Sequence, residues 1–212
     1  GNMAGSLING LLESGTAPSD IAATDPIPAQ LEKLAPLGVQ AATDNNQAVE
    51  FADVIVLAIK PQITGEVLKQ ILGLKPTQLV VSIVAGIDLR SLETWLPKDQ
   101  PIVRCMPNTP ALIGAGMTGL FANSQVDEQQ KAAATRILSA VGEVAWVSHE
   151  ADLDAVTALS GSGPAYFFML MENMIAAGKK LGLDEELSTT LTLQTAFGAA
   201  LMAKKDKANP GT

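Results

Sequence analysis

Histidine and cysteine are almost absent from this 212-residue sequence, which contains one of each, His149 and Cys105. A single cysteine excludes an intrachain disulfide, and without a histidine partner Cys105 is predicted to be a core residue rather than a nucleophile. A Ser-His-Asp triad would have to use His149, which we expect in a surface loop. No His, Cys and carboxylate residues have the spacing of a metal site, so no metal is predicted. The sequence therefore argues against a hydrolase with a Ser-His-Asp triad and against a metalloenzyme.

Basic clusters and long apolar runs are also missing. The chain carries 14 basic and 22 acidic residues, which gives a net charge of −8. Nucleic-acid binding needs several cationic contacts, so we expect no nucleic-acid partner. The longest apolar window, residues 165–171, is far shorter than the roughly 20 residues of a membrane span, and no signal-like segment is present. We expect no membrane contact and a cytoplasmic location.

Aromatic residues are only 4% of a chain that is 47% hydrophobic, so Ala, Leu, Val and Ile must form most of the core. Short β-branched runs alternate with helical patterns, which is typical of βαβ units around a parallel sheet. The predicted strands cover residues 53–59, 78–84, 101–106 and 143–148, with weaker candidates at 19–25 and 38–43. The predicted helices between them cover 3–13, 27–35, 47–52, 62–73, 89–95 and 127–140.

Strand patterns stop near residue 150, and three helical patterns follow, with Gly182 ending the second and Asp184 capping the third. We therefore predict an α/β fold in which a doubly wound dinucleotide-binding domain, residues 1–149, precedes an all-helical domain, residues 150–212. No Pro- or Ser-rich linker separates the two, so we expect a rigid junction.

The opening segment "GNMAGSLING" reads as the second half of the G-x-G-x-x-[GA] fingerprint, with Gly1 and Ala4 at a helix start. We expect the first strand and first glycine of that motif to lie upstream. A glycine there lets backbone approach a pyrophosphate, and the helix N-terminus attracts its charge. A helix that simply begins after a glycine is the alternative. Asp25 lies where an acid meets the adenosine ribose, which favours NADH, or else it only caps the next helix.

Two further loops, "AIKPQ" and "SIVAGI", follow buried strands, so both are predicted to face the ligand. Lys60 either contacts a phosphate or ribose or is a solvated loop residue. In the polar turn predicted for residues 104–120, Asn108 can offer a donor and an acceptor to a carboxamide or substrate. The segment "LSGSGP" places Ser162, Gly163 and Pro164 at the start of an apolar helix. Either the N-terminus of this helix binds an anion, or the glycines allow another helix to cross closely.

Six blocks carry a specific resemblance to a known family: "GNMA", "AIKPQ", "SIVAGI", "RCMPNTPALIGAGMTGL", "DAVTALSGSGPAYFF" and "KLGL". In this order and at these spacings the chain resembles pyrroline-5-carboxylate reductases over essentially its whole length. The resemblance implies reduction of the C=N bond of 1-pyrroline-5-carboxylate by NADPH or NADH to give L-proline, the last step of proline biosynthesis. It also implies a Rossmann domain and a helical domain that interleaves with a second subunit, giving a homodimer or a larger ring of dimers.

The resemblance also assigns roles to individual residues. Thr157 is expected to supply the hydroxyl beside the imine nitrogen, and Glu150 is expected near the substrate. The polar turn and the helix start described above add Asn108, Ser162 and Gly163 as expected substrate contacts. A protonated cyclic imine is a good electrophile, so one hydroxyl donor suffices and no strong base is needed. The expected cofactor contacts are Gly1, Asn2, Met3, Asp25, Asn45, Ala58, Ile59, Lys60, Pro61, Ile83, Val84 and Ala85. The family's Ser/Thr/Gly-rich loop for the substrate carboxylate is expected beyond "ANPGT", where this sequence ends.

Two other classes compete with this interpretation. Another two-domain NAD(P)-dependent dehydrogenase, of the 3-hydroxyacid type, would need a catalytic lysine at the domain junction, and residues 150–165 contain none. A non-catalytic nucleotide sensor would need only the glycine-bordered turns. Hydride transfer suits a chain that is poor in acid–base groups, because the cofactor carries the reactive hydride.

Overall fold

The computed structural model describes residues 1–206, which form two compact units. The first unit is Gly1–Gly161 and the second begins at Ser162. Within residues 1–206 no helix has the length and apolar character needed to cross a membrane.

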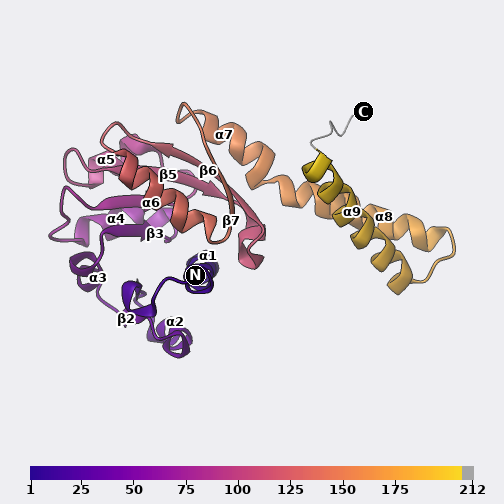
Figure 1. Cartoon of the computed structure of the whole chain (residues 1–212), viewed down its shortest axis with the longest axis horizontal. Helices are drawn as coiled ribbons and strands as arrows, with labels where there is room; N and C mark the ends of the chain where they lie inside the picture. The colour runs from indigo at the N-terminus through magenta and orange to yellow at the C-terminus, as the bar shows by residue number, and fades with distance from the viewer. Residues whose placement is uncertain (207–212) are drawn as a thin grey trace. The chain divides into compact units, whose positions relative to one another are not determined.

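A five-stranded mixed sheet forms the centre of the first unit, in the order β3-β4-β5-β6-β7 (Figure 1). Its strands are Val54–Leu57 (β3), Leu79–Ser82 (β4), Ile102–Pro107 (β5), Gly116–Ala122 (β6) and Gly142–Trp146 (β7). Strands β3, β4 and β5 are parallel, whereas β6 runs antiparallel to β5, and β7 runs parallel to β6. A separate parallel pair joins β1 (Ala22–Thr24) to β2 (Gln40–Ala42).

Helices cover both faces of this sheet, because alternate strand residues point to opposite sides. Leu79 and Val81 of β4 pack in one buried cluster with Leu7 and Leu138, which come from α1 and α6. Val80 between them belongs to a second cluster with residues of α4 and α5. The doubly wound arrangement predicted from the continuous apolar runs is therefore confirmed.

The helices of the first unit are mostly short. They are α1 (Asn2–Glu13), α2 (Pro28–Leu31), α3 (Asn45–Phe51), α4 (Thr64–Gln70), α5 (Leu89–Trp95), α6 (Glu128–Ser139) and α7 (Asp152–Val156). Four 3-10 turns lie at Pro18–Asp20, Glu32–Leu37, Pro61–Ile63 and Thr109–Ile113, and a π-helical turn, Thr157–Gly161, follows α7. The helix expected over 27–35 is divided into α2 and a 3-10 turn that contains Pro36, which lacks the N–H of a regular helix.

One strand, β6, was missed by the sequence analysis, which expected a polar turn over residues 104–120. Glycines made this segment look like a loop, but two of them are required by packing against β6. A Cβ on Gly116 would lie 2.7 Å from the Ala111 Cβ, and one on Gly119 would lie 2.7 Å from Val156 Cγ1. Gly119 therefore lets α7 approach the sheet closely.

Gly142, at the start of β7, offers a test of this packing. Its φ of +149° is rare for residues with a side chain, and an added Cβ would overlap the backbone of Gly116 on the neighbouring strand. We expect Gly142→Ala to lower the free energy of unfolding by about 3 kcal/mol or more, measured by urea denaturation. Gly73→Ala is the control, because Gly73 also has a positive φ (+72°) but nothing lies within 4 Å of the added Cβ. Equal losses in the two variants would contradict the packing argument.

The second unit is an antiparallel pair of helices, α8 (Gly163–Lys180) and α9 (Glu185–Asp206), which lie side by side in Figure 1. Asp184 caps α9 as predicted, because its Oδ1 accepts the Leu187 N–H at 2.8 Å. Gly178 lets the helices approach, since a Cβ there would lie 2.7 Å from Ser188 Oγ. Large apolar side chains remain exposed on both helices, among them Tyr166, Phe167, Phe168, Met169, Leu170, Leu191, Phe197 and Met202.

Candidate active site

A hollow of about 140 Å³ lies at the carboxyl ends of β4 and β5, where open α/β sheets bind their ligands. Three segments of the first unit line it: the loop after β4, the second half of β5, and α7 with its π-helical turn. The lining residues are Val84, Ala85, Gly86, Arg104, Cys105, Met106, Leu153, Asp154 and Thr157. Two groups of predicted residues, the Val84–Ala85 loop and Thr157, therefore share one cavity.

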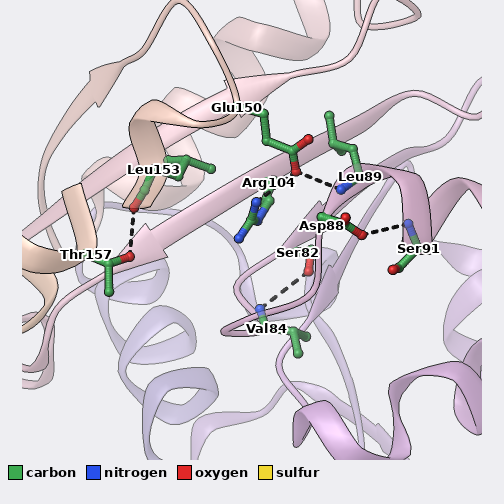
Figure 2. A network of polar contacts seen from close by, with 9 residues as sticks. All are labelled: Ser82, Val84, Asp88, Leu89, Ser91, Arg104, Glu150, Leu153 and Thr157. Carbon is green, nitrogen blue, oxygen red and sulfur yellow. Dashed lines mark hydrogen bonds and ion pairs between the residues drawn. The ribbon is translucent and has the colours of Figure 1, made fainter. Parts of the chain in front are cut away.

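Thr157 is the first residue of the π-helical turn, a distortion that is frequent at functional sites. Its hydroxyl donates a hydrogen bond to the Leu153 carbonyl oxygen at 2.7 Å, one helical turn earlier (Figure 2). Because that bond uses the only proton of the hydroxyl, the lone pairs of Oγ1 are what this group presents to a ligand. The oxygen is therefore placed as an acceptor, whereas the sequence analysis expected a donor.

A polar network connects α7 to the start of α5 across the top of β5. Arg104 Nη1 lies 2.8 Å from Glu150 Oε1, and the same oxygen accepts the Leu89 N–H at 2.7 Å (Figure 2). Both charged side chains are mostly shielded, with 15% exposed for Arg104 and 29% for Glu150. Separating the two side chains would leave each charge shielded from water and without a partner, which costs free energy. The pair is therefore held in a fixed geometry.

Asp88 extends this network on the α5 side. It is the N-cap of α5, and its Oδ1 accepts the Ser91 N–H at 2.9 Å (Figure 2). Hydrogen bonds from Ser91 hold the pKa of the Asp88 carboxyl below its ordinary value, and the positive charge of Arg104 adds to this effect.

Asn108 has both halves of its amide engaged within the protein. Its Nδ2 donates to the Ser160 carbonyl oxygen at 3.1 Å, and its Oδ1 accepts the Met117 N–H at 2.8 Å. The side chain thus links the π-helical turn to the start of β6. Its expected contact with a substrate stays a prediction, and the structure adds a bracing role that the sequence analysis did not foresee.

The residues expected to hold a dinucleotide lie on several loops of the first unit. The segment Ala58 to Pro61 follows β3 and the segment Ile83 to Ala85 follows β4; the strands are neighbours, and the Ile83 N–H bonds the Leu57 carbonyl oxygen at 3.2 Å. Lys60 is exposed, at the start of the 3-10 turn Pro61–Ile63. Gly1 precedes α1, whose first turn has no side-chain cap and no acidic residue, and Asn2 and Met3 begin that helix. Its N–H groups are therefore open to an anion.

Asp25 and Asn45 lie at the ends of the small β1–β2 pair. Asp25 follows β1, and its Oδ1 accepts the Ile27 N–H at 2.9 Å. Ile27 is itself the N-cap of α2, and α2 has no side-chain cap, so Asp25 does not cap the next helix. Thr24 Oγ1 donates to Asn45 Oδ1 at 2.6 Å. The local hydrogen bond leaves Asp25 Oδ2 for other partners, so the expected ribose contact stays a prediction.

Ser162 and Gly163 begin the second unit, just ahead of α8. Ser162 makes no side-chain cap, and Pro164 occupies the first turn, as its fixed φ allows. These residues form the N-terminus of α8, and their contact with a ligand stays a prediction.

Cys105 was predicted to lie in the core and His149 in a surface loop, and both predictions are confirmed. Cys105 is buried in the core, where burial raises the pKa of its thiol far above the ordinary range, so it is not a nucleophile. His149 is an exposed loop residue. Among residues 1–206 no group of three His, Cys, Asp or Glu side chains could hold a metal ion.

Arg104 and Asp154 were missed as site residues by the sequence analysis. Arg104 gave one signal, because it is the only charged residue in the apolar run "PIVRCM". Asp154 precedes Thr157 by three residues, a helical spacing that places both on one side. Neither signal indicates a pocket without knowledge of which segments meet there.

Comparison with known proteins matches this architecture to two family models. Residues 150–212 match the pyrroline-5-carboxylate reductase dimerisation model. Residues 1–86 match a model described as NADP oxidoreductase, coenzyme F420-dependent. The chain thus has a dinucleotide-binding part and a dimerisation part, and it forms a homodimer.

Individual relatives agree with these models. The pyrroline-5-carboxylate reductase of Pseudomonas aeruginosa is 51% identical over 212 residues, covering 99% of this chain and 78% of the relative. The solved structure of that reductase from Coxiella burnetii is 43% identical with a TM-score of 0.94, over 99% of this chain and 79% of the other. The Plasmodium falciparum structure, with NADP bound, is 32% identical with a TM-score of 0.87, over 100% and 78%. This chain belongs to the pyrroline-5-carboxylate reductase family.

Proposed function

We propose that this protein reduces the C=N bond of 1-pyrroline-5-carboxylate with NAD(P)H and so forms L-proline, the last step of proline biosynthesis. The observation that carries the proposal is the shared hollow, in which the loop after β4 faces Thr157. The pocket lining contains no lysine, so it does not offer the catalytic group that a 3-hydroxyacid dehydrogenase would need.

The described residues fit a dinucleotide. The N-terminus of α1, which has no side-chain cap and no acidic residue in its first turn, suits a pyrophosphate. We propose that Gly1, Asn2 and Met3 hold the pyrophosphate and that Lys60 supplies a cation to a phosphate or ribose. When bound, the reduced nicotinamide supplies the hydride. The remaining proposed contacts are Asp25, Asn45, Ala58, Ile59, Pro61, Ile83, Val84 and Ala85.

For the substrate we propose Thr157 beside the ring nitrogen. Glu150 uses Oε1 in the network with Arg104 and Leu89, and no hydrogen bond or ion pair of Oε2 is found within residues 1–206, so we propose that Oε2 bonds the substrate. We further propose that Ser162 and Gly163 offer an anion seat at the start of α8 and that Asn108 shapes the pocket. The protein's task is to bind and orient, because a protonated imine needs little activation beyond placement.

The Arg104–Glu150 pair supplies a prediction about this positioning. Arg104→Met removes the charge partner of Glu150 while keeping the volume of the side chain. We expect kcat to fall about tenfold and the affinity for NADPH to remain, because the variant loosens α7 and Thr157 rather than the cofactor loops. Lys131→Met is the control, since Lys131 pairs with Glu128 on the exposed side of α6. Unchanged kcat in Arg104→Met would contradict the positioning role.

The division into functional domains at residues 149 and 150 is also a proposal, supported by the start of the dimerisation model at residue 150. By contact, α7 and the π-helical turn pack with the first unit, up to Gly161. We propose that they bring residues of the dimerisation part to the dinucleotide domain.

The proposed assembly is a ring of dimers, which light scattering is expected to show. The proposed location is the cytoplasm, where a free thiol such as that of Cys105 is stable, and cell fractionation is expected to place the protein there.

Turnover by the full-length protein tests the function. With 1-pyrroline-5-carboxylate present, the absorbance of the reduced nicotinamide should fall, and parallel runs with NADH and NADPH give the cofactor preference. A ribose contact from Asp25 predicts the higher kcat/KM with NADH. Oxidation of the cofactor with 3-hydroxyacid-derived ketones but not with the imine would favour the competing dehydrogenase.

A further inference from the structure

The pocket beside Thr157 has an unbalanced negative charge. Arg104 and Asp154 are the two charged residues in its lining. Arg104 is paired with Glu150 at 2.8 Å, so its positive charge is already balanced. Asp154 is exposed on α7, and no hydrogen bond or ion pair of its carboxylate is found within residues 1–206. The unpaired charge among the lining residues is therefore that of Asp154.

The hydroxyl oxygen of Thr157, like this carboxylate, is available as a hydrogen-bond acceptor. Its proton is donated to Leu153, so Oγ1 offers lone pairs to the pocket (Figure 2). Asp154 and Thr157 are three positions apart, a helical spacing that places both on the side of α7 that lines the hollow. Two acceptors and one unpaired negative charge suit a ligand that brings its own proton and a positive charge.

We propose that Asp154 is a catalytic residue that binds the substrate in its protonated, iminium form, with Thr157 accepting the N–H of the ring. The proposal rests on the reductase function proposed above and deepens it. During the reaction the hydride forms a C–H bond at the imine carbon, and the π electron pair of the C=N bond moves to nitrogen, which becomes neutral. No proton leaves the protein in this step. The neutral amine takes its proton from solvent afterwards.

The test compares two ring ligands of the full-length protein. L-Proline carries a positive charge on its ring nitrogen, whereas tetrahydrofuran-2-carboxylate has a neutral oxygen at that position and the same carboxylate. In Asp154→Asn we expect the affinity for L-proline to fall about 10- to 100-fold, the loss typical of a hydrogen bond between charged groups, and the affinity for the oxygen analogue to be unchanged. The kcat/KM for the imine should fall by a similar factor.

Asp152→Asn is the matched control on the same helix. The Asp152 carboxylate accepts the His149 N–H at 3.0 Å and does not line the hollow, so both affinities should match the wild type. Equal weakening of the two ligands in Asp154→Asn, or no weakening of either, would overturn the role of Asp154. A wild type that binds the ligands but never oxidises NAD(P)H with the imine would instead contradict the proposed function.

Discussion

Replacing Thr157 by valine is expected to lower kcat for 1-pyrroline-5-carboxylate about 10- to 100-fold, with the affinity for NADPH unchanged. Valine keeps the volume and the branched shape of threonine but removes Oγ1, the only polar atom of this pocket-lining side chain. The ring nitrogen then loses its hydrogen-bond partner, while the cofactor loops after β3 and β4 are untouched. Steady-state kinetics and NADPH titration by fluorescence measure the two quantities.

Thr157→Ser is the control for this substitution, because serine restores the hydroxyl and its bond to Leu153. We expect it to regain most of the turnover. A valine variant as active as the wild type would show that Thr157 does not touch the reacting ring. A serine variant as impaired as the valine variant would assign the effect to packing of the methyl group.

Replacing Phe168 by glutamate is expected to convert the homodimer into monomers. Phe168 is 63% exposed in the isolated chain, within the run from Tyr166 to Leu170 in which every side chain is more than half exposed. Such an apolar helix needs a partner surface. Burying a phenylalanine contributes about 1.5–3 kcal/mol, and in a twofold dimer each substitution acts twice. Sedimentation at several protein concentrations gives the dissociation constant.

Lys180→Gln provides the comparison for Phe168→Glu, because Lys180 is an exposed polar residue at the end of the same helix. The dimer should persist in this control. A Phe168→Glu protein that stays dimeric at low micromolar concentration would mean that another surface holds the subunits together. A helical signal in circular dichroism close to that of the wild type would show that the variant is folded.

Much of the fold could be predicted because its strands are buried on both faces. Continuous apolar runs located β3, β4 and β5, and α5 spans the predicted residues, 89–95, with Asp88 as its cap. The antiparallel β6 was missed because its glycines serve packing: Gly116 and Gly119 make room for neighbouring segments that lie far away in the sequence. A local pattern does not distinguish such glycines from turn glycines.

The candidate site was predictable only where a single segment carries the signal. Glycine-bordered loops after strands predicted cofactor contacts, and the resemblance of the block around Thr157 to a known family predicted a substrate contact; both stay predictions. The pairing of Arg104 with Glu150, 46 residues apart, depends on the approach of α7 to β5, which no spacing reveals. The commitment of the Asn108 amide to Ser160 and Met117 likewise appears only once the turns are folded.

Transfer of isotope from cofactor to product tests the central claim most directly. The full-length protein is supplied with 1-pyrroline-5-carboxylate and with NADPH that carries deuterium at the transferable position of its nicotinamide. The account predicts one equivalent of L-proline per NADPH oxidised, with a single deuterium on the ring carbon that belonged to the C=N bond. Oxidation of NADPH without label in L-proline, or no oxidation at all, would contradict it.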